Sequence, residues 1–378
     1  MKARPVVLLL GPSREAISGV STHLNLLLPA PTLAREFDLA HFQVGSEGRA
    51  EGRLRRWLRL AADPIRLAAA ILRHDAGLVH VNTSLNARAY WRDIVFVAVA
   101  KLLGSRVLYQ VHGGQLPQNF LGGGRLAGAL LRFTLRLPDV VVVLASVELD
   151  AYRAFLPGQP VALVPNGIDC ERFLRNGRPA AEPQAPLRLA FIGRLAREKG
   201  VFEILEAMRL ARGKGVAARL LVAGGGPDEQ GLRQRVHELA LEREVTFVGV
   251  LDEQAKAQLL ARCDVLLLPS YSEGLPYALL EAMAAGAVPV VTRVGAMPDV
   301  VSEGRHGLFV PVADAPALAE AIGALAADRA SLACMRAAGR VRVAAAFSIG
   351  RVAEDLRALY STLLKHHVRN RRLGRSPT

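Results

Sequence analysis

The stretch YSEGLPYALLEAMAAG, residues 271–286, sets Glu273 and Glu281 around an apolar, alanine-rich run. Pro276 is typical of the start of a helix and Gly286 of its end. Because the N-terminal end of a helix favours anions, the loop before Pro276 is a candidate anion site. Glu281 lies deeper in the helix among leucine, alanine and methionine, where an unpaired charge is costly.

The rest of the chain alternates short apolar runs with helical patterns such as 54–73 and 86–103, which favours α/β domains with parallel sheets. The predicted fold is α/β, with two Rossmann-like, doubly wound domains facing a central cleft where ligands bind at strand carboxyl ends. The predicted buried strands are 5–11, 77–82, 105–113, 139–145, 161–167, 187–193, 218–226, 244–250, 263–270 and 287–292.

A length of 378 residues also favours two domains. A polar, proline-containing segment at 171–186 is predicted to link a first domain, 1–170, to a second, 187–346. Residues 347–366 are predicted to form a C-terminal helix that can cross back to the first domain. A basic tail follows at 367–378.

Composition narrows the class of protein. The net charge of +14 favours solubility, or contact with anionic membranes and phosphorylated substrates. Nucleic acid is disfavoured as a partner, because the basic stretches lack interleaved aromatics. Three distant cysteines indicate a reducing compartment and predict no zinc site. No apolar run approaches the length of a membrane span, and we expect a cytoplasmic protein.

A second candidate anion site is FIGRLAREKG, residues 191–200, which connects a predicted strand to a helix. Arg194 and Lys199 on this loop can straddle a diphosphate, the first through paired N–H donors and the second as a point charge. The alternative is a solvated basic turn. The glycines at 224–226 do not complete a dinucleotide fingerprint, because a proline follows them.

The two glutamates fit the same ligand. A rise of about 1.5 Å per residue places Glu281 roughly 7 Å along the helix from Pro276. Glu273 at the helix mouth and Glu281 deeper in could therefore bind hydroxyls on either side of a diphosphate, as sugar and ribose offer. The alternative for Glu281 is a plain ion pair with an arginine or lysine at a domain edge.

Taken together, these motifs resemble the retaining glycosyltransferases of family 4, which have the two-domain GT-B fold. The resemblance runs nearly end to end and includes the spacing of the two glutamates. Its other motifs are VHGG (111–114), VPNGID (164–169), GRLAREKG (193–200), GGGP (224–227) and FVGVL (247–251). It implies an acceptor-binding first domain and a second domain that binds a UDP-, GDP- or ADP-sugar, with no cofactor and no metal ion.

The resemblance also implies roles at matching positions. His112 would lie across the cleft near the transferred sugar, Val250 beside the nucleobase, and Gly19 where the first loop approaches the phosphates. From the residues alone, the alternative for His112 is a strand-end histidine bonded to backbone. The implied catalytic residues are His112, Arg194, Lys199 and Glu273. The implied donor-binding residues are Gly19, Arg194, Lys199, Val250, Glu273, Gly274, Leu275 and Glu281.

Two departures from the family pattern bear on the donor. Residues 18–20 read SGV, where many relatives have two glycines. After Glu273 the chain reads GLP instead of the common Gly-Phe-Gly, and Pro276 has no N–H to donate to a sugar or phosphate. The EGLP form occurs in the family, so the donor sugar stays open.

The segment 49–73 is basic and amphipathic. It can lie on an anionic bilayer or pack as an ordinary surface helix on the sheet. We expect peripheral contact with the inner face of the cytoplasmic membrane, and a lipid-linked or cell-envelope glycan as acceptor. The residues that carry this expectation are Arg49, Arg53, Arg55, Arg56, Arg59 and Trp57.

Two other function classes stay open. Sugar-nucleotide epimerases share the two-domain architecture, although the charged set of the two motifs favours transfer. A non-catalytic nucleotide-sugar-binding subunit is the second alternative, supported by Pro276 and by the single glycine of the first loop.

Overall fold

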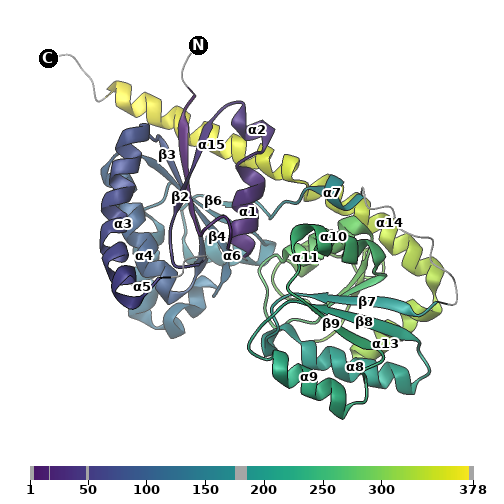
Figure 1. Cartoon of the computed structure of the whole chain (residues 1–378). Coiled ribbons are helices and arrows are strands. Elements are labelled where there is room, and N and C mark those ends of the chain that lie inside the picture. The colour runs from purple at the N-terminus through teal and green to yellow at the C-terminus, as the bar shows by residue number, and fades with distance from the viewer. Residues whose placement is uncertain (1–3, 17, 48–50, 175–184, 374–378) are drawn as a thin grey trace. The chain divides into compact units, whose positions relative to one another are not determined.

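A computed structural model of the chain separates it into two units (Figure 1). Unit 1 holds residues 1–167 and 349–378, and unit 2 holds residues 168–348. The predicted linker therefore begins inside unit 2, where helix α7 (Cys170–Leu174) forms its first part. The structure describes residues 4–16, 18–47, 51–174 and 185–373, so 175–184 of the predicted linker and 374–378 of the predicted tail lie outside it.

Unit 1 is built on a six-stranded parallel sheet in the order β2-β1-β3-β4-β5-β6. The sequence patterns miss only β2 in this sheet. It is an edge strand with mostly half-exposed residues, so it lacks the apolar run of a central strand. The strands are β1 (Val6–Gly11), β2 (Asp38–Gln43), β3 (Leu78–Leu85), β4 (Arg106–Gly114), β5 (Val140–Val143) and β6 (Val161–Leu163).

Helices cover both faces of this sheet, each over its own hydrophobic cluster. On one face lie α1 (Gly19–Leu27), α2 (Pro31–Ala34) and α15 (Ile349–Leu373). On the other lie α3 (Arg53–His74), α4 (Ala87–Leu102), the 3-10 helix η1 (Pro117–Gly123), α5 (Arg125–Leu135) and α6 (Ser146–Phe155).

The last helix, α15, is part of the core of unit 1. Val352, Leu356 and Tyr360 are fully buried there. The hydroxyl of Tyr360 lies 2.6 Å from Nδ1 of His80, and a side chain on Gly167 would collide with Val352. Helix α15 thus packs on the unit that residues 1–167 form.

Unit 2 has a second six-stranded parallel sheet, in the order β12-β11-β10-β7-β8-β9. Its strands are β7 (Leu187–Ile192), β8 (Ala218–Ala223), β9 (Val245–Gly249), β10 (Val265–Leu268), β11 (Val288–Val291) and β12 (Leu308–Phe309). The patterns miss β12, because two residues are too short for a period. The predicted pair of doubly wound domains is confirmed.

The helices of unit 2 follow its strands in alternation. They are η2 (Arg197–Lys199), α8 (Val201–Gly213), α9 (Glu229–Glu238), α10 (Glu253–Arg262), α11 (Tyr277–Ala285), α12 (Met297–Val300), α13 (Ala315–Ala327) and α14 (Arg329–Ala346). Among the described residues of both units, no helix combines the length and the apolar character needed to cross a bilayer.

Candidate functional site

The strand order of unit 2 reverses between β7 and β10, and doubly wound sheets bind ligands beyond the strand ends at such a point. The loop after β7 carries Arg194 and Lys199, and the loop after β10 carries Glu273. Lys199 Nζ donates to Glu273 Oε1 at 2.7 Å. Two motifs that are distant in the sequence therefore meet at one point, as we would expect of a binding site.

Glu273 has a second donor that the sequence analysis missed. Ser270 Oγ donates to the same carboxylate oxygen at 2.8 Å, and Oε2 has no partner among the described residues. The side chain is 11% exposed. A carboxylate oriented by two donors, with one oxygen left over, is suited to accept a hydrogen bond from a ligand hydroxyl.

Backbone contacts fix the two loops against each other. Tyr271 N donates to Glu198 O at 2.8 Å. Gly200 has a φ of +70°, and a Cβ at that position would collide with the carbonyl of Pro269. Only glycine permits so close an approach, which explains why the basic motif ends in one.

The Glu273 loop is also supported from its far side. Thr292 Oγ1 donates to Ser270 O at 2.6 Å. Gly295 has a φ of +53°, and a Cβ there would collide with the carbonyl of Glu273. The position of the Glu273 carboxylate is therefore set by three segments of the chain and does not depend on the loop alone.

Four other residues implied as donor-binding lie at the same carboxyl edge of the unit 2 sheet. Arg194 is exposed and has no ion-pair partner among the described residues, so its charge is available. Val250, directly after β9, is 59% exposed. Gly274 N–H has no acceptor in the described part of the chain, whereas Leu275 is buried and contributes packing.

Glu281 occupies a different environment from Glu273. It lies in α11, is 2% exposed, and accepts a hydrogen bond from Lys256 Nζ at 2.7 Å. Lys256 also contacts Glu253, which in turn pairs with Arg172. The ion pair that the residues alone left as an alternative is thus present, and a role on ribose hydroxyls stays a prediction.

One feature of Glu281 is compatible with a ligand as well. Its Oε2 is buried and has no hydrogen-bond partner among the described residues. Burial raises the pKa of this carboxyl, and the Lys256 ammonium opposes that rise. A buried acceptor without a donor is costly in the empty protein, and a ligand hydroxyl would relieve that cost.

His112, in unit 1, is bonded to a side chain, and its ring makes no hydrogen bond to backbone among the described residues. Its Nε2 lies 2.9 Å from Asn82 Oδ1, while Asn82 Nδ2 donates to the carbonyl of Leu10. The amide of Asn82 is thereby oriented with its oxygen toward the ring, so His112 Nε2 carries the proton and Nδ1 the lone pair.

Three histidines cluster in this part of unit 1. Burial lowers the pKa of His112 to about 4 and that of His80 to about 3. His23 stacks edge-on against His112 with ring centroids 4.6 Å apart, and burial lowers its pKa well below the usual value. All three rings are uncharged at neutral pH, so His112 can orient a ligand but cannot act there as a cation.

Gly19 is the first residue of α1, directly after Ser18, whose side chain caps the helix by accepting from Ser21 N. It is exposed, as an approach of the first loop to a ligand requires. Its role at the phosphates stays a prediction.

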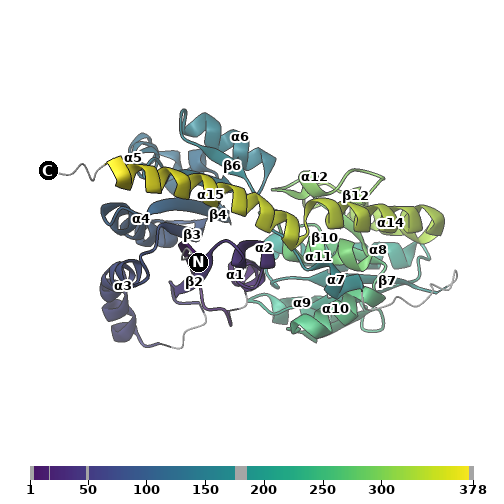
Figure 2. The same cartoon turned by 90° about the horizontal axis from the view of Figure 1, so that it is seen from above.

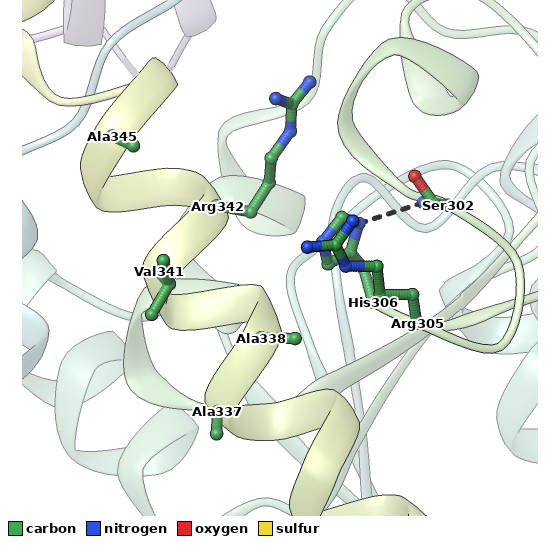
Figure 3. Close-up of a pocket in the computed structure, with 8 residues that line it drawn as sticks. All are labelled: Ser302, Arg305, His306, Ala337, Ala338, Val341, Arg342 and Ala345. Atoms are coloured by element: carbon green, nitrogen blue, oxygen red, sulfur yellow. Dashed lines mark hydrogen bonds between the residues drawn. The ribbon is translucent and has the colours of Figure 1, made fainter.

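A hollow elsewhere in unit 2 contains none of the predicted residues (Figure 3). It lies between α14 and the turn before β12, where Ser302 N donates to His306 Nδ1, and the guanidinium of Arg342 donates to the carbonyl of Asp299. Because this turn precedes its strand, the hollow opens at the amino edge of the parallel sheet, opposite the switch-point loops. No group of three or more histidine, cysteine, aspartate or glutamate side chains among the described residues could hold a metal ion.

Comparison with known proteins gives the family. The model of glycosyl transferases group 1 matches residues 176–342, and that of glycosyltransferase family 4 matches residues 27–172. The chain is also 30% identical over 261 residues to a GDP-mannose-dependent alpha-(1-6)-phosphatidylinositol monomannoside mannosyltransferase of Mycobacterium tuberculosis, covering 65% of this chain and 67% of that protein. This chain belongs to glycosyltransferase family 4.

Other proteins are similar over a shorter stretch of sequence or in fold alone. A protein named as a colanic acid biosynthesis glycosyltransferase, WcaL of Escherichia coli, is 36% identical over 174 residues, or 44% of this chain and 42% of that protein. The chain thus spans about half the length of the first curated relatives that it matches. Anabaena HepE, solved in complex with UDP, has the same fold, with a TM-score of 0.74 at 15% identity over 95% of this chain and all of that one.

Sequence reasoning missed the side chains that bond three of the predicted site residues in this family 4 chain. Ser270 bonds Glu273, Lys256 bonds Glu281, and Asn82 bonds His112. Ser270 closes the strand run LLLPS, so its place at a strand end was visible, but not which group it would bond. Lys256 belongs to another helix than Glu281, and Asn82 to another strand than His112. No spacing in the sequence connects these pairs.

Acid is expected to destabilise unit 1, because the unfolded chain binds protons that the buried histidines do not. The stabilisation that comes from keeping these histidines neutral should be fully present above pH 6.5. It should be lost as the pH falls toward their lowered pKa values, about 4 for His112 and about 3 for His80. Each histidine contributes up to about 1.4 kcal/mol per pH unit in that window. Urea unfolding at pH 7 and pH 5 measures the slope. His23→Leu should reduce it, and an unchanged slope in that variant would show that His23 is not among its sources.

Proposed function

We propose that the protein is a retaining glycosyltransferase that moves a sugar from a nucleotide-diphosphate sugar to an acceptor hydroxyl. The observation that carries this proposal is the Lys199–Glu273 pair at the switch point of unit 2, with the available cation of Arg194 on the same loop. Family membership favours transfer over the epimerase alternative.

The charges at the site fit the chemistry of donor cleavage. When the bond from the anomeric carbon to the diphosphate breaks, negative charge develops on the leaving group. Arg194, Lys199 and the nearby helix N-termini would stabilise that charge, an effect worth several kcal/mol. This array would replace a metal ion, so we infer that the reaction needs no divalent cation.

Glu273 is proposed to bind hydroxyls of the donor sugar through its unpartnered oxygen, and not to act as a nucleophile. The acceptor oxygen would attack on the face from which the diphosphate departs, through an oxocarbenium-like state. Its proton would pass to the leaving phosphate oxygen. His112, uncharged and with its tautomer set by Asn82, is proposed to orient the transferred sugar.

The acceptor is proposed to be a lipid-linked or cell-envelope glycan, and the protein to work in polysaccharide biosynthesis at the cytoplasmic face of the membrane. Two observations support this. Relatives are named for colanic acid biosynthesis and for a phosphatidylinositol mannoside. The chain also carries a strong positive charge that suits an anionic surface.

The cations of the basic loop allow a direct test. Arg194→Ala and Lys199→Ala are each expected to lower kcat/KM at least about tenfold, because each removes a positive charge that stabilises the leaving diphosphate. Lys214→Ala is the matched control, since Lys214 is exposed at the opposite end of α8. Equal turnover in all three variants would reject the site.

Glu281 requires a paired design, because removing it leaves Lys256 buried without its partner. Glu281→Gln and Lys256→Gln both break the ion pair, but only the first removes the carboxylate. We expect Glu281→Gln to reduce kcat/KM at least about tenfold more than Lys256→Gln, at similar thermal midpoints. Equal losses would assign Glu281 a structural role instead of ribose binding.

The donor can be identified by thermal stabilisation. A nucleotide sugar at 100 times its Kd should stabilise the protein by about 2.7 kcal/mol, and UDP-, GDP- and ADP-sugars are the set to compare. The stabilising donor is then expected to be hydrolysed slowly, with the same rate in EDTA. Binding without any turnover would favour the non-catalytic subunit, and loss of turnover in EDTA would contradict the metal-free reaction.

A further inference from the structure

Helices α3, α4 and α5 lie next to one another over the same face of the unit 1 sheet (Figures 1 and 2). Their outer surface is unusually apolar. Of the sixteen large hydrophobic side chains that are exposed among the described residues, eleven belong to these three helices. Scattered exposed hydrophobics need no explanation, but a concentration over adjoining helices marks a contact surface.

On α3 the exposed side chains form a stripe. Leu54, Leu58, Ile65 and Leu72 repeat at helical spacing and are 64–74% exposed, with Trp57 beside them at 72%. The opposite side of the same helix is already used, because Leu67 and Ile71 are buried in the core of unit 1. The exposed stripe is therefore not needed to attach α3 to the sheet.

The stripe continues onto the two neighbouring helices. On α4, Trp91 is 53% exposed and Leu102 86% exposed, and on α5, Leu126 is 88% exposed and Phe133 68% exposed. Tyr90 of α4 and Thr134 of α5 share a hydrogen bond in the interior, which keeps these two helices in register. Both tryptophans of the chain, Trp57 and Trp91, thus lie on one surface.

The exposed charges within these three helices have one sign. The only acidic residues within the three helices, Asp63 and Asp93, are 1% and 0% exposed. Each is paired with arginine, Asp63 with Arg59 and Arg66, and Asp93 with Arg92. The exposed cations that have no ion pair among the described residues are Arg55, Arg56, Arg73, Arg88, Arg125 and Arg132.

The structure corrects one part of the sequence expectation. Arg59 is 9% exposed and binds Glu51 and Asp63, so it supports α3 from within and is not available to a surface ligand. Arg49 lies outside the described residues. The basic surface is therefore wider than α3 but does not include every arginine of segment 49–73.

We propose that the outer surface of α3, α4 and α5 is a membrane-binding face that holds unit 1 on anionic phospholipid. Its apolar side chains would enter the boundary between headgroups and acyl chains, and its arginines would bind lipid phosphates. A second copy of the chain is a poorer occupant, because a symmetric contact would bring the same cations together, and the three helices themselves offer no exposed carboxylate to pair them. The inference rests on the proposed function only for the idea of a lipid-linked acceptor.

The face also has a preferred end. Trp57, Trp91, Arg56, Arg88 and Arg125 all lie within the first two turns of their helices. These turns follow the carboxyl ends of parallel strands, which is the edge where doubly wound sheets bind ligands. The arrangement places the ligand-binding edge of unit 1 beside the lipid headgroups, where a lipid-linked acceptor presents its sugar.

The test uses the intrinsic fluorescence of the full chain, because both of its tryptophans lie on the proposed face. Vesicles that contain phosphatidylglycerol should shift the emission to shorter wavelength and protect it from acrylamide, whereas pure phosphatidylcholine vesicles should bind far more weakly. High salt should weaken binding to the anionic vesicles. Flotation of the same mixtures gives binding independently of fluorescence.

Two variants separate the parts of the face, and flotation reports on both. Arg55→Glu/Arg56→Glu and Trp57→Ala/Trp91→Ala should each weaken binding roughly tenfold or more. Val341→Ala, an exposed position on α14 of unit 2, is the matched control and should bind normally. Lys199→Ala changes the candidate donor site of unit 2 and should bind the vesicles normally. Vesicle binding is therefore measured independently of the proposed transfer reaction. Absent flotation at low salt, equal binding by all variants, or a concentration-dependent dimer abolished by the tryptophan substitutions would overturn the proposal.

Discussion

The ion pair between Lys199 and Glu273 is the interaction on which the candidate site depends. It joins the loop after β7 to the loop after β10, and the reversal of strand order between them is what makes those two loops neighbours. Each loop is also held by backbone contacts that only glycine allows, at Gly200 and Gly295. The carboxylate is therefore oriented before any ligand arrives, which reduces the entropy lost on binding.

The protein distributes its charges in two ways. Buried ionisable groups are either paired, as Glu281 is with Lys256, or kept neutral, as the histidines of unit 1 are. Arg194, in contrast, is exposed, carries no ion-pair partner among the described residues, and is free to meet phosphate. The first arrangement preserves the fold, and the second leaves charge available for negatively charged ligands and surfaces.

The sequence was informative wherever a local pattern determines the structure. The strand runs, the helix that Gly286 ends with a φ of +84°, and the loop positions of Arg194 and Glu273 all follow from neighbouring residues. Strand β2 was missed because an edge strand needs no continuous apolar run, and β12 was missed because two residues are too short to show a period. The contact of Lys256 with Glu281 and the burial of Arg59 depend on how helices pack, which no local pattern encodes. Ribose binding by Glu281, which was inferred from the family resemblance, stays a prediction.

The placement of α15 has a consequence for how the chain folds during synthesis. Unit 2 is one continuous segment, 168–348, whereas the core of unit 1 needs Val352, Leu356 and Tyr360 from near the end of the chain. The ribosome therefore synthesises all of unit 2 before it reaches the helix that completes unit 1. Until then the side chains that Tyr360 covers stay open to solvent, so the half of the protein that is made first is the half that matures last.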